Sequence, residues 1–245
     1  MDWQDDAIVL GARRYGESSA VLEVLTRAHG RHQGLVRGGG SRRQKPVLLA
    51  GNTVSVAWRA RLEEHLGGFT VELQRSRAGE ILDRGDALTG LNAFAEIARA
   101  VLPEREPCES VYVGAEILLD AIERDDVEHW GPLYVRWEAG LLEALGFGLD
   151  LSRCAATGGT DDLRFVSPKS GRAVSGAAGA PYAPRLLALP GFLLGSQNAS
   201  AGMADIRDGL KLTGHFLRER ALLPHHAQMP LARLRLEERM GRESA

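Results

Sequence analysis

Ser19-Ala20-Val21-Leu22-Glu23-Val24-Leu25-Thr26 is the stretch that decides the fold of the first part of this chain. Its β-branched and apolar residues are typical of a β-strand, and Ala28-His29-Gly30, shortly after it, has the composition of a turn. Similar stretches occupy residues 7–10, 33–37, 53–59 and 69–73. Five short strands in about 70 residues predict a small closed or partly closed barrel, such as an OB-fold.

Beyond residue 86 the apolar residues recur every three or four positions, which predicts amphipathic helices. One helix ends at Pro103, a second runs from Val111 to Ile122, and a fourth runs from Ile206 to Leu217. We expect Pro132 to start the third, which stops near Gly146. Residues 151–185 lose the helical period and predict a loop-rich insertion. The expected fold class is therefore α+β, with a barrel domain over 1–80 and a helical domain over 81–245.

The composition suits a globular protein with a core, since 44% of the 245 residues are hydrophobic and 25% are charged. The chain begins with an acidic segment, unlike a secretory signal, and no apolar run approaches the roughly 18 residues that a membrane span needs. Only Cys108 and Cys154 could form a disulfide, which argues against a disulfide framework. We therefore expect a cytoplasmic protein that does not enter a membrane.

The basic residues are concentrated in one place. The chain has a net charge of −2, yet the segment between Glu23 and Glu63 carries eight Lys or Arg residues and no Asp or Glu. Such a segment can be an ordinary solvated surface, but a solvated surface usually mixes both signs of charge. Basic charge on a small β-domain instead indicates a nucleic-acid surface, where Arg and Lys neutralise phosphates. An acidic middle, residues 81–150, suggests a second module with other partners.

The best phosphate contacts are the cations that flank a glycine turn, because this turn can follow a nucleic-acid backbone: Arg37, Arg42, Arg43 and Lys45. A second group comprises Arg14, Arg27, Arg31, Arg59 and Arg61. Trp58 could stack on a base, or it could fill the barrel core. Both interpretations of Trp58 remain open.

Four segments resemble the RecO family of bacterial recombination mediators. The first runs from Ala7-Ile8-Val9-Leu10 through Arg14-Tyr15-Gly16-Glu17-Ser18-Ser19, and the second is Leu25-Thr26 with His29-Gly30. The third is the basic run from Leu35 to Arg43, and the fourth runs from Arg136 to Leu151 and is followed by Cys154. Their order and spacing cover nearly the whole chain.

The resemblance implies an N-terminal OB-fold and a helical domain with a zinc-ribbon-like insertion. It implies binding of single- and double-stranded DNA, annealing of complementary strands, and association with the nucleoid. It also implies binding to the single-stranded-DNA-binding protein and to RecR, with which such proteins help to load RecA.

The chain departs from this family at the zinc motif. Many members have two C-x-x-C pairs, whose positions here are Cys154 and Thr157, then a pair near Ser175 and Ala178. One thiolate cannot hold a structural zinc, which needs four ligands. We therefore predict no metal, no other cofactor and a degenerate, cysteine-poor insertion over residues 151–185.

Arg136 is a candidate contact for a partner protein. In the family, the acidic, aromatic-ended tail of the single-stranded-DNA-binding protein docks in the helical domain, and a basic side chain beside an apolar groove suits such a tail. A surface Arg lying on apolar neighbours is the plainer alternative. His225-His226 suggests a turn rather than a metal site.

We expect no catalytic residues, because no phosphate-loop or nucleophile-elbow motif is present. An RNA-binding OB-fold adaptor is the first alternative function. The second is a hydrolase or transferase whose site is assembled from distant residues.

Overall fold

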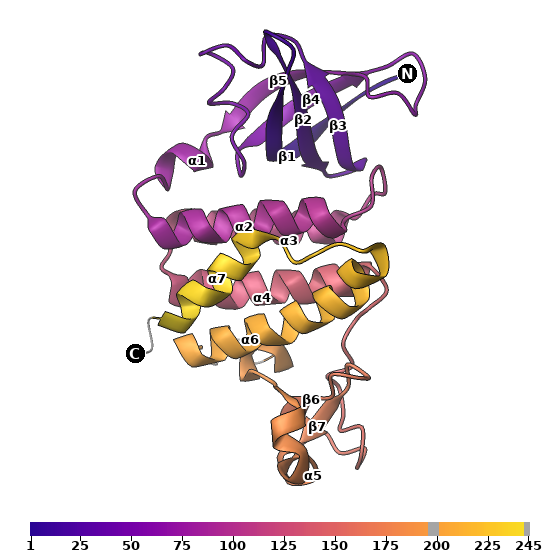
Figure 1. Cartoon of the computed structure of the whole chain (residues 1–245), viewed down its shortest axis with the longest axis vertical. Coiled ribbons are helices and arrows are strands. Elements are labelled where there is room, and N and C mark those ends of the chain that lie inside the picture. Colours follow the sequence, from indigo (N-terminus) through magenta and orange to yellow (C-terminus); the bar gives the residue numbers. More distant parts are fainter. Residues whose placement is uncertain (196–200, 243–245) are drawn as a thin grey trace. The chain divides into compact units, whose positions relative to one another are not determined.

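The structure, a computed structural model, describes residues 1–195 and 201–242. It has mixed α and β composition and divides into two compact units, Met1–Glu123 and Arg124–Ala245 (Figure 1). Each unit has its own set of strands and helices. Among the described residues, no helix is both long enough and apolar enough to cross a lipid bilayer.

The five predicted strands are confirmed. They are β1 (Asp2–Tyr15), β2 (Ser19–Thr26), β3 (Gly30–Val36), β4 (Thr53–Arg59) and β5 (Gly68–Arg75). β1 is longer than predicted because the acidic start of the chain also pairs. Its polar residues Asp2, Gln4 and Asp6 alternate with the less exposed Trp3 and Asp5, as expected for a strand with one face in solvent.

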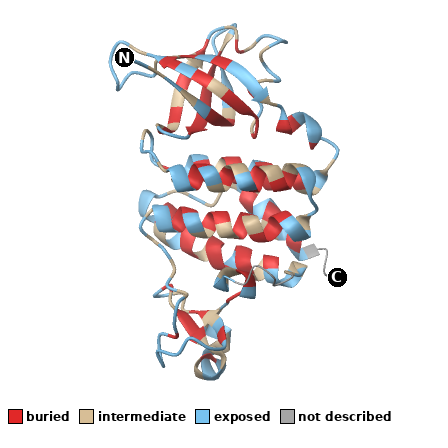
Figure 2. Cartoon of the chain, turned by 180° about the vertical axis from the view of Figure 1, so that it is seen from behind, coloured by how far each residue is buried: buried red, intermediate tan, exposed pale blue. Residues whose placement is uncertain are grey.

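The strands form a closed barrel in the order β1-β2-β3-β5-β4. β1 pairs with β4 over Asp2–Ile8 and with β2 over Ala7–Tyr15, with an irregularity between Val9 and Gly11 that bends the strand. The seam between β3 and β5 is short, because these two strands pair only at Leu35 and Gly68. Apolar residues of all five strands fill the interior. Figure 2 colours the buried positions along the strands red.

The first unit also contains helices α1 (Arg77–Glu80), α2 (Gly85–Val101) and α3 (Glu109–Arg124). Carboxylates of α3 hold the end of β5 and α1 in place. Arg75 lies 2.9 Å from Asp120 and 2.6 Å from Glu123, and the buried Arg77 also pairs with Asp120. These ion pairs fasten the barrel to α3 within this unit.

In the second unit, three longer helices are α4 (Val127–Ala144), α6 (Met203–Phe216) and α7 (Leu231–Arg242). α6 continues through η3 (Leu217–Leu222) and η4 (Leu223–His225). α7 was not predicted from the sequence, because its buried positions include the charged Arg233 beside Leu236 and Met240. The charged Arg233 interrupts the apolar spacing of α7, so the sequence does not show a helical period there.

The prediction for Pro132 was wrong. α4 begins at Val127, and Pro132 lies inside it as the sixth residue. Proline has no N–H to donate to the carbonyl four residues earlier, so this position loses one backbone hydrogen bond. The predicted stop is confirmed, since α4 ends at Ala144 and Gly146 has a φ of +82°, the left-handed conformation that glycine adopts readily.

The insertion is more regular than predicted, and its sheet extends past the predicted end at residue 185. It contains a three-stranded sheet in the order β7-β6-β8, formed by β6 (Leu163–Val166), β7 (Ala173–Ser175) and β8 (Leu187–Ala188). The remaining elements are α5 (Gly176–Gly179), η1 (Ala180–Arg185) and η2 (Gly191–Leu194). Strands of two to four residues are too short to show a period of two, which explains why the sequence indicated only loops.

A buried ion pair fixes α7 in the second unit. Arg233 Nε donates to Glu138 Oε1 at 2.6 Å, and Nη2 donates to Oε2 at 3.0 Å and to the Leu210 carbonyl at 2.7 Å. Both side chains are fully buried, and the Thr213 hydroxyl donates to the same carboxylate. Removing one partner leaves the other charge buried without compensation.

Arg233→Met should destabilise the second unit by about 3–5 kcal/mol, because it leaves the Glu138 carboxylate uncompensated. Urea unfolding followed by circular dichroism would measure the loss. The double variant R233M/E138L is the control, and we expect it to recover much of the stability. Equal stability of R233M and the unaltered protein would contradict the assigned role of the pair.

Candidate nucleic-acid interface

A groove of about 850 Å³ lies on the barrel beside the short seam. It collects residues from the start of β1, from the end of β3, and from β4 and β5. Because β3 and β5 pair at a single point, the groove opens between them. Arg37 and Arg59 contribute cationic side chains to a wall that otherwise includes Trp3, Gln44 and Thr70.

The four leading cations come from one loop, residues 37–52, which we call the β3–β4 loop. Gly38 has a φ of +72°, and the Ser41 carbonyl accepts from Gln44 at 3.2 Å and from Lys45 at 3.0 Å, so the loop is turned rather than extended. Leu48, only 4% exposed, anchors the loop in the barrel core.

This anchoring presents the cations to solvent. Arg37, Arg42, Arg43 and Lys45 are exposed, and within residues 1–195 and 201–242 no ion pair is formed by them. Arg61, in the loop between β4 and β5, has the same character. Five exposed cations in the loops on either side of β4 are therefore available to bind anions.

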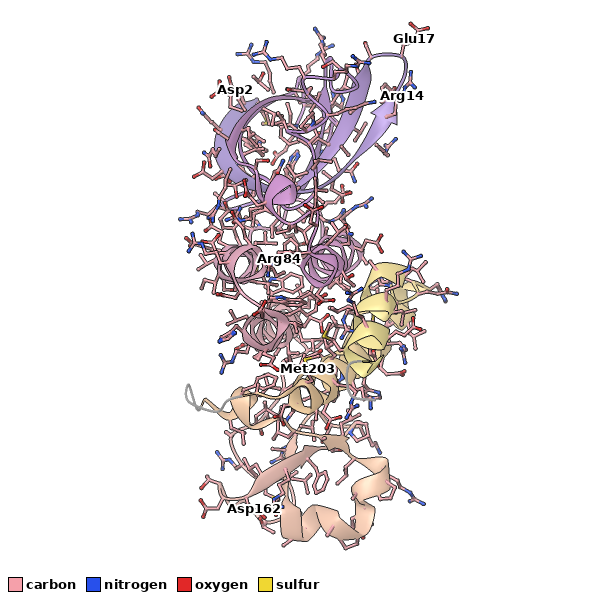
Figure 3. All side chains as sticks on the ribbon, turned by 90° about the vertical axis from the view of Figure 1, so that its left-hand side faces the viewer. Asp2, Arg14, Glu17, Arg84, Asp162 and Met203 are labelled. Carbon is pink, nitrogen blue, oxygen red and sulfur yellow. The ribbon has the colours of Figure 1, made fainter. Side chains whose placement is uncertain are left out.

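The other predicted cations have local partners. Arg27 Nη2 lies 2.9 Å from Glu116, and Arg59 lies 3.3 Å from Asp2 but remains 82% exposed. Arg14 donates to the carbonyls of Gly16 and Glu17 at the tip of the β1–β2 hairpin, where Figure 3 places Arg14 and Glu17 together. Surface pairs such as these contribute little and can exchange partners.

Arg31 is less accessible than the other predicted cations. Its side chain is only 14% exposed, pairs with Glu23 and donates to the Leu102 carbonyl at 2.7 Å. Arg99 pairs with the same Glu23 at 2.8 Å. The charge of Arg31 is thus paired inside the first unit.

The structure favours the core interpretation of Trp58, which is 2% exposed and whose Nε1 donates to the Leu66 carbonyl at 3.0 Å. Trp3 is the aromatic residue that sequence reasoning missed. It is partly exposed, lines the groove, and stacks on His29 at a centroid distance of 4.1 Å. The alternation of Trp3, Asp5 and Ala7 along β1 was the signal that could have found it.

Arg136 lies beside a hollow of about 540 Å³ in the second unit. Its guanidinium donates to the Phe192 carbonyl at 3.2 and 2.9 Å and lies over the Phe192 ring. Ala139, Leu149 and Leu151 are among the apolar residues that line the hollow. A cation therefore stands next to an apolar surface, and its contact with Phe192 also fits the alternative of a surface Arg that lies on apolar neighbours.

Cys154, Thr157 and Ser175 come together in the insertion. The Ser175 N–H donates to Cys154 Sγ at 3.3 Å, and the two side chains lie 3.5 Å apart. The hydrogen bond with the Ser175 side chain, and then the one with Thr157, lower the pKa of the buried Cys154 thiol to about 6. Ala178 lies in α5.

These residues do not fit a zinc ion. In the described part of the chain, no three His, Cys, Asp or Glu residues gather as a metal site would require. Hydroxyl and amide groups replace the absent thiolates as partners of Cys154. His225 is the last residue of η4, and only His226, which has a φ of 56°, lies in the turn that follows.

Elemental analysis of purified protein should give far less than one zinc per chain, because a single thiolate binds zinc weakly. The variant T157C/S175C/A178C, which supplies four thiols, serves as the positive control for zinc uptake. One zinc per chain in the unaltered protein would show that other residues hold a metal.

Comparisons with known proteins cover both units. The family model described as "Recombination protein O N terminal" matches residues 1–77, and "Recombination protein O C terminal" matches residues 82–229. The chain is 51% identical to "DNA repair protein RecO" of Cereibacter sphaeroides over 99% of this chain and 100% of that protein. It is 49% identical to the protein of the same name from Rhodospirillum centenum, over 98% and 94% of the two chains.

Proposed function

The chain belongs to the Recombination protein O family, which acts in DNA repair and recombination, and we propose that it is a DNA-binding recombination mediator. In this proposal it binds single- and double-stranded DNA and anneals complementary strands. With RecR, it helps to load RecA onto DNA coated by the single-stranded-DNA-binding protein. The proposed location is the cytoplasm, in association with the nucleoid.

The barrel supports this proposal through its topology. A five-stranded barrel in the order β1-β2-β3-β5-β4 is consistent with an OB-fold, a fold that binds oligonucleotides on its strand face and loops. In this fold, the barrel supplies a rigid surface and the loops supply most contacts. The proposed DNA surface here consists of the β3–β4 loop and the groove beside the seam.

The observation that carries the proposal is the set of exposed cations without ion-pair partners in the described residues: Arg37, Arg42, Arg43, Lys45 and Arg61. Such cations neutralise phosphates and release counterions, with little dependence on base sequence. Annealing then requires no catalytic group. Neutralisation lowers the repulsion between two strands, which can pair when both lie on the protein.

The Arg136 hollow supports a second contact. Its guanidinium can pair with a carboxylate, and the adjoining apolar wall can receive an aromatic side chain. These are the two features of an acidic, aromatic-ended peptide such as the tail of the single-stranded-DNA-binding protein. We place this tail in the Arg136 hollow.

Reversing Arg42 and Arg43 to Glu should weaken binding of a single-stranded oligonucleotide by at least about tenfold. It should also lower the slope of log K against log salt by about 1.4, because two phosphate contacts are lost. Fluorescence anisotropy across a salt series measures both quantities.

The matched control for this experiment is R153E/R185E, which makes the same change of charge on exposed residues of the insertion. We expect its affinity to stay within about twofold of the unaltered protein, and both variants to unfold at unchanged temperature. Equal affinity of R42E/R43E and the control would remove the β3–β4 loop from the DNA surface.

Arg136→Ala should weaken binding of an acidic peptide that ends in a phenylalanine by about tenfold or more, because a charge-assisted contact is lost. Arg218→Ala, which removes an exposed cation of the second unit outside the hollow, is the control and should bind normally. Isothermal titration calorimetry measures both. Unchanged binding by Arg136→Ala would place the peptide elsewhere.

A further inference from the structure

A second hollow, of about 480 Å³, lies at the mouth of the barrel, and we call it the barrel-mouth pocket. It shares Asp2, Trp3 and Trp58 with the groove, so the two hollows adjoin. Its other lining residues include His29, His32, Glu63 and Arg105. The volume falls in the range of about 300–1,000 Å³ that small-molecule sites occupy.

Aromatic rings form the wall of this pocket. Trp3 stacks on His29 with an interplanar angle of 8°, and on Trp58 at a centroid distance of 5.6 Å with an angle of 19°. Asp5 Oδ2 lies 3.1 Å from His29 Nδ1 and fixes the orientation of the His29 ring. The His29 side chain is 34% exposed. The rings of Trp58, Trp3 and His29 thus form a near-parallel stack, which begins at the buried Trp58 and ends at the solvent-accessible His29.

His32 supplies a hydrogen-bond acceptor in the same pocket. The residue is 3% exposed, and its Nδ1 lies 3.0 Å from the Gln33 carbonyl. A carbonyl only accepts, so Nδ1 carries the proton, and Nε2 of a neutral ring is then an acceptor. Burial lowers the pKa of His32 and keeps the ring neutral at pH 7. No partner for Nε2 is found among the described residues.

The rim of the pocket is held in place by Arg105. Its guanidinium donates to the backbone carbonyls of Glu63 and His65, the latter at 2.9 Å. The loop after α2 is thereby fastened to the loop between β4 and β5. The pocket is therefore pre-formed, with aromatic walls, one ring-nitrogen acceptor and a polar rim.

We propose that the barrel-mouth pocket receives one unstacked nucleobase of a single strand bound in the groove, and that it prefers a base with an exocyclic amino group. This inference rests on the proposed DNA-binding function and adds a base-reading subsite to it.

The chemistry of the bases accounts for this preference. Any base can stack on the aromatic wall, but cytosine and adenine carry an amino donor where thymine carries a carbonyl oxygen. That donor can bond to His32 Nε2, whereas the thymine oxygen would face another acceptor. A base within a duplex must first be unpaired and unstacked, which costs free energy. The pocket therefore favours single strands over duplexes.

Anisotropy with oligo-dC and oligo-dT of equal length tests the preference on the unaltered protein. We expect oligo-dC to bind about threefold to tenfold more tightly, since one added hydrogen bond contributes roughly that factor. Both oligonucleotides should show the same salt dependence, because their phosphates are identical. Equal affinity for the two would overturn the proposed base preference.

Variants of the pocket residues then test which side chains cause the tight binding and the base preference. Trp3→Ala should weaken the binding of both oligonucleotides by about fivefold or more, because the aromatic wall loses a ring. His32→Gln should bring the dC/dT ratio close to one. Tyr15→Ala, an exposed aromatic residue outside the pocket, is the matched control and should change neither quantity. Thermal unfolding identifies any variant that fails to fold, and the comparison on the unaltered protein does not depend on these variants.

The outcomes separate this inference from the proposed function. Salt-sensitive binding that shows no base preference and no effect of Trp3→Ala would overturn the pocket and leave the DNA surface intact. No binding of either oligonucleotide at low salt would overturn the DNA-binding function itself. A third outcome is saturable binding of a lysine-rich or arginine-rich peptide in the pocket, together with equal affinity for oligo-dC and oligo-dT. This result would assign the aromatic wall to a cationic partner and contradict the inference.

Discussion

Closure of the barrel through β1 is the constraint on which the first unit depends. β1 pairs with β4 along its first half and with β2 along its second, so one strand joins both ends of the sheet. Closure satisfies the backbone of these strands and buries their inward apolar residues. The one weak place is the short seam between β3 and β5, and the groove lies beside it. The proposed site therefore follows from how the barrel closes.

Carboxylates distant in the sequence decide which cations remain available. Glu116 pairs with Arg27, Glu23 takes Arg31 and Arg99, and α3 supplies the partners of Arg75 and Arg77. These pairs fasten the parts of the first unit together. The cations of the β3–β4 loop lie beyond their reach, because Leu48 anchors the loop and turns its charged residues outward. The ion pairs within the first unit and the proposed phosphate contacts thus use different arginines.

The strands and most helices could be predicted from the sequence. Apolar residues recur at every second position in a half-buried strand and at every third or fourth position in an amphipathic helix. The sequence could not predict α7, whose buried positions include Arg233, or the insertion sheet, whose strands are too short to show a period. Within the candidate site, local sequence identified the cations of the β3–β4 loop. The pairing of Arg31 and the stacking of Trp3 depend on residues brought together only by folding. A charge count along the chain cannot register such contacts.

We propose that phosphate neutralisation on the barrel surface holds a DNA strand. The most direct measurement is the affinity of the intact protein for a labelled single-stranded oligonucleotide as salt is raised. We expect log K to fall linearly with log salt, with a slope of about −2 to −4, since three to five exposed cations contribute roughly 0.7 each. Affinity that does not change with salt, or no binding at low salt, would contradict it.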